Sequence, residues 1–291
     1  MSEILQLLVN GAALGSAYAL VALGFVLVLN ATGAVNFAHG DLVMAGGMAT
    51  VVLAGMLDWP AIVLLPSVMI VMGGVGFLVA GLIYQPLRAQ PTISVLIATI
   101  ALGTMLQNGA TALFGPEERV GPPLFGAGMM EVGGLMLSRQ AVATIAVAAL
   151  LIFAQHALFR YTQFGRRLRA TAQDRQMARA VGVPVNRMIF ATFALSAASA
   201  GAAGLLLSNQ FFVSPRDGGN LMIAAYIAAV LGGWGSLGGA VVGALFIALF
   251  QVVVAAYSSY LIATTLLYVC VLAVLVLRPS GLFGETIRKR V

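Results

Sequence analysis

Six stretches of the chain each run for about 20 residues with almost no charged side chain, which is the length of a helix that spans a membrane. Only 8% of all residues are charged, whereas a soluble domain carries about 25%. Nine acidic and fifteen basic residues are too few to give 291 residues a surface that faces water. We therefore predict an all-α integral membrane protein. The predicted spans are roughly 5–29, 61–84, 93–114, 140–159, 187–208 and 260–277.

Two further apolar regions are interrupted by glycine and polar residues. The first covers roughly 33–57, and the second, roughly 222–257, is long enough for two passes separated by the sequence GGWGSLGGA. With these regions the sequence predicts a polytopic helix bundle of eight or nine crossings, with broken helices near 33–47 and 231–240. No stretch resembles a linker or a separate soluble domain, so we expect residues 1–291 to form a single transmembrane domain.

Positive charge is concentrated in one segment, where a row of arginines is opposed only by Asp174. Nucleic-acid-binding proteins also use basic patches. This patch lies between two predicted spans, however, so the positive-inside rule places it in the cytoplasm and we expect no nucleic-acid partner. Residues 160–186 are then a cytoplasmic loop, and 115–139 and 209–221 lie outside. The basic residues assigned to the inner side are Arg160, Arg166, Arg167, Arg169, Arg175, Arg179 and Arg187, with Arg288, Lys289 and Arg290 near the end of the chain.

The arginine-rich loop predicts a short amphipathic helix at roughly 170–181, followed by Gly182 and Pro184 as stop signals. Anionic lipid can hold such a charged helix at the membrane surface. Small and apolar side chains alternate with the charges, however, and this favours a helix that docks in a groove of a partner protein. These side chains are Ala172, Met177, Ala178, Ala180 and Val181.

Polar residues interrupt the first broken region, in the sequence VNFAHGDLVMAGG at 35–47. A charged side chain at the centre of a membrane helix costs about 2.5–3.5 kcal/mol, so such residues face water, a bundle interior or a partner. In one interpretation Asn36, His39 and Asp41 line a translocation pathway. In the other, the segment is a turn at the membrane edge, Asp41 caps the next helix and His39 pairs with Asp41. The two interpretations are compatible, because a capped half-helix can line a pathway.

The second break, LGGWGSLGGA at 231–240, admits the same two interpretations. Gly233, Trp234 and Ser236 are candidates for a constriction of the pathway. Alternatively, the segment is an interfacial turn in which the tryptophan belongs to the aromatic belt of the membrane. In the run at 93–114, Gln107 and Asn108 are expected to cross-link helices through their amides.

Signatures of catalysis and of cofactor binding are missing from the sequence. No Walker motif, dinucleotide-binding glycine motif or cluster of metal ligands occurs, and the chain has two histidines and one cysteine. We therefore expect a chain that is not an enzyme and that binds no cofactor or metal itself. A stand-alone secondary transporter with His39 and Asp41 as a proton relay is the alternative to a subunit that other proteins drive.

Four stretches, in this order, resemble the permease subunits of branched-chain amino-acid ABC importers, and they cover nearly the whole chain. The chain is similar to the shorter of the two partner permeases in that family. The four stretches are GSAYALVALGFVLVLNATGAVNFAHGDLVMAGG, YQPLRAQPTISVLIATIALGTMLQN, RATAQDRQMARAVGVPVNRMIFATFALSAASAGAAGLL and GGWGSLGGAVVGALFIALFQ.

The resemblance implies a helical protein of the bacterial inner membrane that pairs as a heterodimer with a second permease. It also implies two cytoplasmic ATPase subunits, which would use ATP and Mg²⁺, and a periplasmic solute-binding protein that delivers the ligand. The solute stays open among branched-chain amino acids, urea, short amides and small acids. A match to the cytoplasmic loop of the family, whose short helix seats in the ATPase, is found at Ala172, Asp174, Arg175, Ala178 and Gly182.

Overall fold

The computed structural model describes residues 2–57, 59–126, 128–132, 135–278 and 281–282, so Arg288, Lys289 and Arg290 lie outside the described residues. Within the described part, eight helices are long and apolar enough to cross a membrane, and one apolar helix, α10, is shorter. The predicted all-α polytopic bundle is confirmed, and every uninterrupted apolar run is a helix. The long helices are α1 (Ser2–Thr32), α2 (His39–Leu57), α3 (Ala61–Val79), α5 (Thr92–Phe114), α6 (Arg139–Tyr161), α9 (Val185–Gln210), α11 (Leu237–Tyr257) and α12 (Tyr260–Leu277), and α10 covers Gly218–Gly232.

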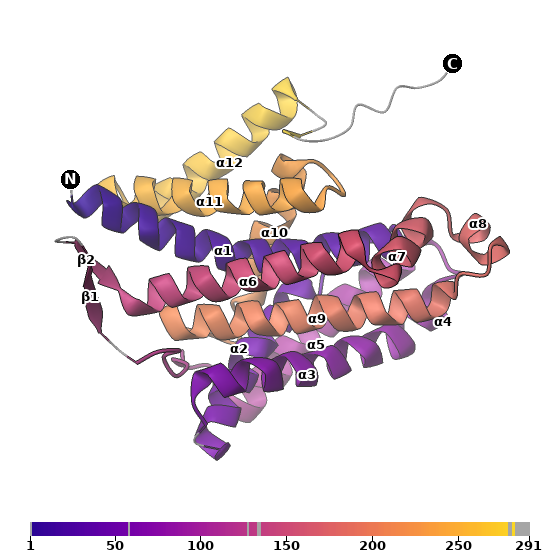
Figure 1. The fold of residues 1–291 in the computed structure, drawn as a ribbon, viewed down its shortest axis with the longest axis horizontal. Helices are drawn as coiled ribbons and strands as arrows, with labels where there is room; N and C mark the ends of the chain where they lie inside the picture. Colours follow the sequence, from indigo (N-terminus) through magenta and orange to yellow (C-terminus); the bar gives the residue numbers. More distant parts are fainter. Residues whose placement is uncertain (1, 58, 127, 133–134, 279–280, 283–291) are drawn as a thin grey trace.

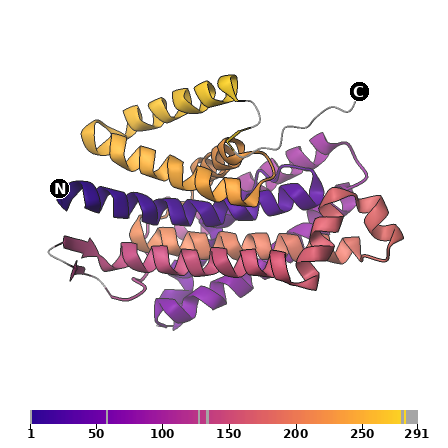
Figure 2. The same ribbon diagram turned by 45° about the horizontal axis from the view of Figure 1, so that its top comes forward.

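Helices α1 and α9 form the centre of the bundle, and α3, α6 and α11 run beside them (Figure 1). Most of the apolar stretch of α1 (83%) and of α9 (72%) is buried, whereas only 17% is buried in α5 and in α12. Figure 2 shows α12 at the edge of the bundle, where it packs mainly on α11. The apolar surfaces of α5 and α12 are therefore available to lipid or to a partner subunit.

Helix α3 continues through a π-helical turn, Ala80–Tyr84, into the short helix α4 (Gln85–Leu87). A π-helical turn inserts an extra residue into the helix and often marks a functional position. Here it ends at Tyr84, whose ring is buried against Phe193 of α9 at a centroid distance of 5.4 Å.

The two ends of the bundle differ in structure (Figure 1), and the arginines of the loop at 160–187 give one of them a positive charge. One end carries α4 and the arginine-rich connection between α6 and α9. The other carries the start of α1 and a hairpin of β1 (Met129–Val132) and β2 (Leu135–Ser138). A hydrogen bond from the Gln6 side chain of α1 to the Met136 carbonyl of β2 joins the hairpin to α1. The hairpin lies within the segment 115–139, and its two short strands pair with each other. We call the arginine-rich end the inner end and the hairpin end the outer end, after the orientation expected from the sequence.

Candidate functional site

The segment after α1 turns back into the bundle before α2 begins. Gly33 has a left-handed backbone (φ 66°) at the inner end of α1. Six residues later, the His39 ring Nε2 lies 2.9 Å from the Val21 carbonyl oxygen. Val21 precedes the end of α1 by about three turns, or roughly 16 Å of helix. Helix α2 therefore begins well inside the bundle, as the prediction of a broken helix near 33–47 requires.

Helix α10 also begins inside the bundle, but it is reached from the outer end. It has 15 residues, about 22 Å of helix, which is shorter than the roughly 30 Å hydrocarbon core. In both views α10 is steeply inclined to α1 and α9 (Figures 1 and 2). The prediction that 209–221 lies entirely outside is therefore wrong at its C-terminal end, where the buried Gly218 starts the short helix α10 inside the protein.

The N-terminal ends of α2 and α10 touch each other. A Cβ atom placed on Gly40 would lie 2.0 Å from the Gly218 carbonyl oxygen, so a side chain larger than hydrogen cannot fit there. The two glycines bring the N-terminal turns of α2 and α10 together beside Asp41. This contact was not predicted from the sequence, although NFAHGD and SPRDGG both place glycine beside polar residues.

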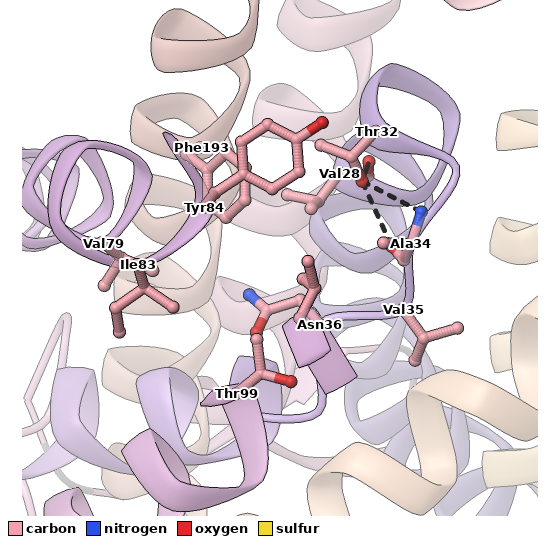
Figure 3. Close-up of a pocket in the computed structure, with 11 residues that line it drawn as sticks. Val28, Thr32, Ala34, Val35, Asn36, Val79, Ile83, Tyr84, Thr99 and Phe193 are labelled. Atoms are coloured by element: carbon pink, nitrogen blue, oxygen red, sulfur yellow. Dashed lines mark hydrogen bonds between the residues drawn. The ribbon is translucent and has the colours of Figure 1, made fainter. Parts of the chain in front are cut away.

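Asn36 lies in the re-entrant segment, which we define as residues 33–38 between α1 and α2, and is only 3% exposed. Its Oδ1 accepts a hydrogen bond from the Ala38 N–H at 3.2 Å. Its Nδ2 has no partner among the described residues and points into a small cavity between α1, α3, α5 and α9 (Figure 3). The cavity offers about 10 Å³ to the centre of a water molecule, which is room for roughly one water. Asn36, and not Asp41, therefore makes the polar turn that precedes α2.

His39 is fully buried and fastens α2 to two other helices. Nε2 faces the Val21 carbonyl, so this nitrogen must carry the proton. Nδ1 lies 3.4 Å from the Ser196 hydroxyl, which itself donates to the Gly24 carbonyl at 2.7 Å. No hydrogen bond joins His39 to Asp41 in the described structure. The alternative interpretation of a His39–Asp41 pair is therefore wrong. A direct proton transfer between the two side chains has no hydrogen bond to follow in the described structure.

Asp41 is also buried, at 5% exposure, but its carboxylate reaches a groove. Oδ1 accepts a hydrogen bond from Gln107 Nε2 of α5 at 2.7 Å. The groove lies between α5 and α10, has a volume of about 400 Å³ and is open on one side of the chain. Gln107 thus links two helices, as expected from the sequence, whereas Asn108 donates only to the Thr104 carbonyl of its own helix.

The second predicted break is a turn between α10 and α11 at the inner end. Gly233 has a positive φ of 106°, and Ser236 caps α11 by accepting the Gly239 N–H at 3.0 Å. Trp234 is half-exposed, and its ring meets Tyr226 edge to face at 5.7 Å. Tyr226 also lines the groove, so the tryptophan adjoins that groove at its inner end. Whether Gly233, Trp234 and Ser236 contact a solute stays a prediction.

The arginine-rich loop contains two helices, α7 (Gln163–Gln173) and α8 (Arg175–Ala180), separated at Asp174. The predicted single helix at 170–181 is therefore wrong in extent. The Asp174 carboxylate accepts the N–H groups of Gln176 and Met177 at 2.8 and 3.0 Å, which starts a new helix. Gly182 then ends α8 with a left-handed backbone (φ 82°), as its position predicts.

One face of α8 packs on the bundle and the other is exposed. Ala178 is buried in a cluster that includes Tyr84 and Phe193, and Arg175 Nη1 donates to the Tyr84 hydroxyl at 3.2 Å. Met177 of α8 and Val181 directly after it are 64% and 72% exposed. Ala172 and Gly182 are exposed as well. An apolar surface of this kind at the water-facing end of a membrane protein is typical of a docking site.

Comparison with known proteins gives one consistent result. Residues 7–277 match the family described as branched-chain amino acid transport system / permease component. The chain is 32% identical to the high-affinity branched-chain amino acid transport system permease protein LivH of Escherichia coli K12, covering 97% of this chain and 96% of that protein. It is 31% identical to the permease protein BraD of Pseudomonas aeruginosa, over 97% and 96% of the two chains.

A more distant relative is the probable LivH permease of Methanocaldococcus jannaschii, which is 25% identical over 93% of this chain and 89% of that protein. No solved structure matches the chain. The family match and the LivH match both extend over nearly the whole sequence. The chain therefore belongs to the family of permease components of branched-chain amino acid transport systems.

Proposed function

We propose that this multi-pass membrane protein is the permease subunit of an ATP-driven importer for branched-chain amino acids or a related small polar solute. The observation that carries the proposal is the match along nearly the entire chain to permeases whose names specify such transport. The proposed partners are a second permease, two cytoplasmic ATPases that use ATP and Mg²⁺, and a periplasmic solute-binding protein. The proposed location is the bacterial inner membrane.

We propose that the groove between α5 and α10 forms half of the translocation pathway. Its walls are supplied by one chain and its remaining side is open, so a second permease subunit would complete it. Ile97, an exposed apolar residue one helical turn before Ile100, extends the groove-bearing side of α5. A heterodimer would cover this apolar surface with protein instead of lipid.

We propose that the ATPases act on α7 and α8. Met177 and Val181 supply the apolar contact, and Arg179 beside them supplies positive charge. Arg175 connects this surface to the π-helical turn through the Tyr84 hydroxyl. Tyr84 in turn lines the same cavity as Asn36. Movement of α8 would therefore reach the re-entrant segment that positions Asp41.

The substitution Met177→Glu tests the docking role, because an exposed side chain is replaced without disturbing the bundle. We expect the purified variant to lose its ATPase subunits and ATP-driven uptake. Gln90→Glu, an exposed polar position between α4 and α5 and outside the proposed docking surface, should retain both. Met177→Glu complexes with unchanged composition and uptake would contradict the docking role. Uptake by this chain alone, abolished by a protonophore, would instead support a secondary transporter.

A further inference from the structure

The groove between α5 and α10 contains a buried carboxylate that has no opposite charge nearby. Asp41 accepts one hydrogen bond among the described residues, from the neutral amide of Gln107. Buried charges in membrane proteins are costly and are generally paired, or they belong to a functional pathway. Gly103 of α5 makes room for the other carboxylate oxygen, since a Cβ there would lie 2.2 Å from Oδ2. The geometry thus keeps a carboxylate at the groove whose Oδ2 accepts no hydrogen bond from the described residues.

The rest of the groove is mainly apolar. Ile100, Met222, Ile223 and Tyr226 form its walls, and Thr104 and Gln107 supply polar atoms on the Asp41 side. A volume of about 400 Å³ is within the range of roughly 300–1,000 Å³ that small-molecule sites occupy. The groove therefore offers one negative charge and a hydrogen-bonding edge to a solute whose other surface is aliphatic.

We propose that this groove binds the ammonium group of a small aliphatic amino acid, with the Asp41 carboxylate as its counter-ion. An ammonium group has three N–H donors. Three residues that line the groove carry acceptor atoms: the carboxylate of Asp41, the side-chain amide of Gln107 and the hydroxyl of Thr104. The aliphatic side chain of the solute then contacts Ile100, Ile223 and Tyr226.

The chemistry of the edge favours an ammonium group over a metal ion. Among the described residues, no group of three His, Cys, Asp or Glu side chains could hold a metal. A single carboxylate with neutral amide and hydroxyl neighbours matches one positive charge with several donors. The first turn of α10 has no side-chain cap and its Gly219 lines the groove, so the positive end of this helix adjoins the site and favours the carboxylate of the same solute.

This inference rests on the proposed transport function, so its test contains a separate check of that function. The complete importer is reconstituted in proteoliposomes with ATP, and uptake of labelled L-leucine is measured. We expect Asp41→Asn to lower uptake about tenfold or more, because a charge-assisted hydrogen bond is lost. Glu3→Gln, an exposed carboxylate at the outer end of α1, is the matched control and should leave uptake unchanged.

A direct binding measurement covers the case in which Asp41→Asn disturbs folding. Ile100→Cys is introduced together with Cys270→Ser, and its reaction with a maleimide is followed in the complex without the solute-binding protein. We expect L-leucine and isopentylamine to slow the reaction. The compound 4-methylpentanoate, which has the same aliphatic group but no ammonium, should not.

The outcomes separate the two hypotheses. Equal protection by leucine and 4-methylpentanoate, no protection by leucine, or normal leucine uptake by Asp41→Asn would each overturn the ammonium site while leaving an importer in place. Failure of the wild-type complex to accumulate leucine, urea or short amides with ATP would instead contradict the proposed function.

Discussion

Asp41 and Asp174 are both aspartates near the start of a helix, but their surroundings differ completely. Asp174 is exposed to water, and its carboxylate accepts two peptide N–H groups of α8. Asp41 is buried inside the bundle and accepts one side-chain N–H from another helix. The first arrangement satisfies the local backbone, and asparagine or serine could provide it equally well. The second places a charge inside the bundle, beside the N-terminal ends of α2 and α10 and one neutral amide, with no basic side chain bonded to it among the described residues.

The largest expected effect concerns the contact that places Asp41. Gly40→Ala puts a methyl group against the Gly218 carbonyl. Neither backbone can move without a shift of α2 or α10. Overpacking of this kind typically costs about 1–3 kcal/mol, occasionally more. We expect the variant to yield little assembled complex in size-exclusion chromatography.

The control for that substitution is Gly55→Ala in the same helix, where no atom lies within 4 Å of the added methyl group. It should assemble like the wild type. Equal assembly of the two alanine variants would show that the N-terminal ends of α2 and α10 are not in contact as described.

The next effect concerns the single donor to Asp41. Gln107→Leu removes the 2.7 Å hydrogen bond and leaves the buried carboxylate without a protein partner. Loss of a hydrogen bond to a charged group costs about 1.5–3 kcal/mol. We expect leucine uptake to fall about tenfold or more, with Asn108→Leu, whose amide bonds only within α5, as the control. Equal uptake by the two variants would show that the hydrogen bond from Gln107 to Asp41 does not contribute to solute binding.

A smaller effect is expected between the loop and the bundle. Tyr84→Phe keeps the buried ring but removes the hydroxyl that accepts from Arg175. The loss of one such hydrogen bond is about 0.5–1.5 kcal/mol. We expect the complex to assemble normally and to import fewer solute molecules per ATP hydrolysed. An unchanged ratio would show that force does not pass through this contact.

The smallest effect is expected at the exposed aspartate. Asp174→Ala removes the cap of α8 and should cost about 1 kcal/mol of local helix stability, whereas Asp174→Asn should restore the cap. Amide hydrogen exchange at Gln176 and Met177 measures this directly. Faster exchange in the alanine variant alone is expected, and equally fast exchange in both variants would contradict a capping role.

The fold could be predicted largely from local features of the sequence. Long apolar runs define the helices because a helix in lipid satisfies its own backbone, and the arginines between 160 and 187 define the inner end. The helix break at Asp174 could also have been found, since an aspartate before RQMARA is a start signal in itself. The mixture of charged and small apolar residues on both sides of Asp174 is also compatible with one continuous amphipathic helix, and that pattern alone does not indicate the break.

The detail of the site could not be predicted in the same way, because distant contacts decide it. Asn36, His39 and Asp41 lie within six residues, yet they face a small cavity, the α1–α9 contact and the groove, respectively. The partner of His39 on α9, Ser196, is 157 residues away in the chain. The start of α10 at Gly218 is likewise fixed by its contact with α2, while its own sequence, SPRDGG, indicates only a loop.

The most direct measurement compares Asp41→Asn with Asp174→Asn in proteoliposomes that contain the complete importer, recording leucine uptake and ATP hydrolysis in the same sample. Both changes replace a carboxylate by an amide of nearly the same size. We expect Asp41→Asn to hydrolyse ATP with little uptake, and Asp174→Asn to retain both activities. Loss of uptake to the same extent in both variants, or in neither, would contradict a solute-binding role for the buried aspartate and a purely structural role for the exposed one.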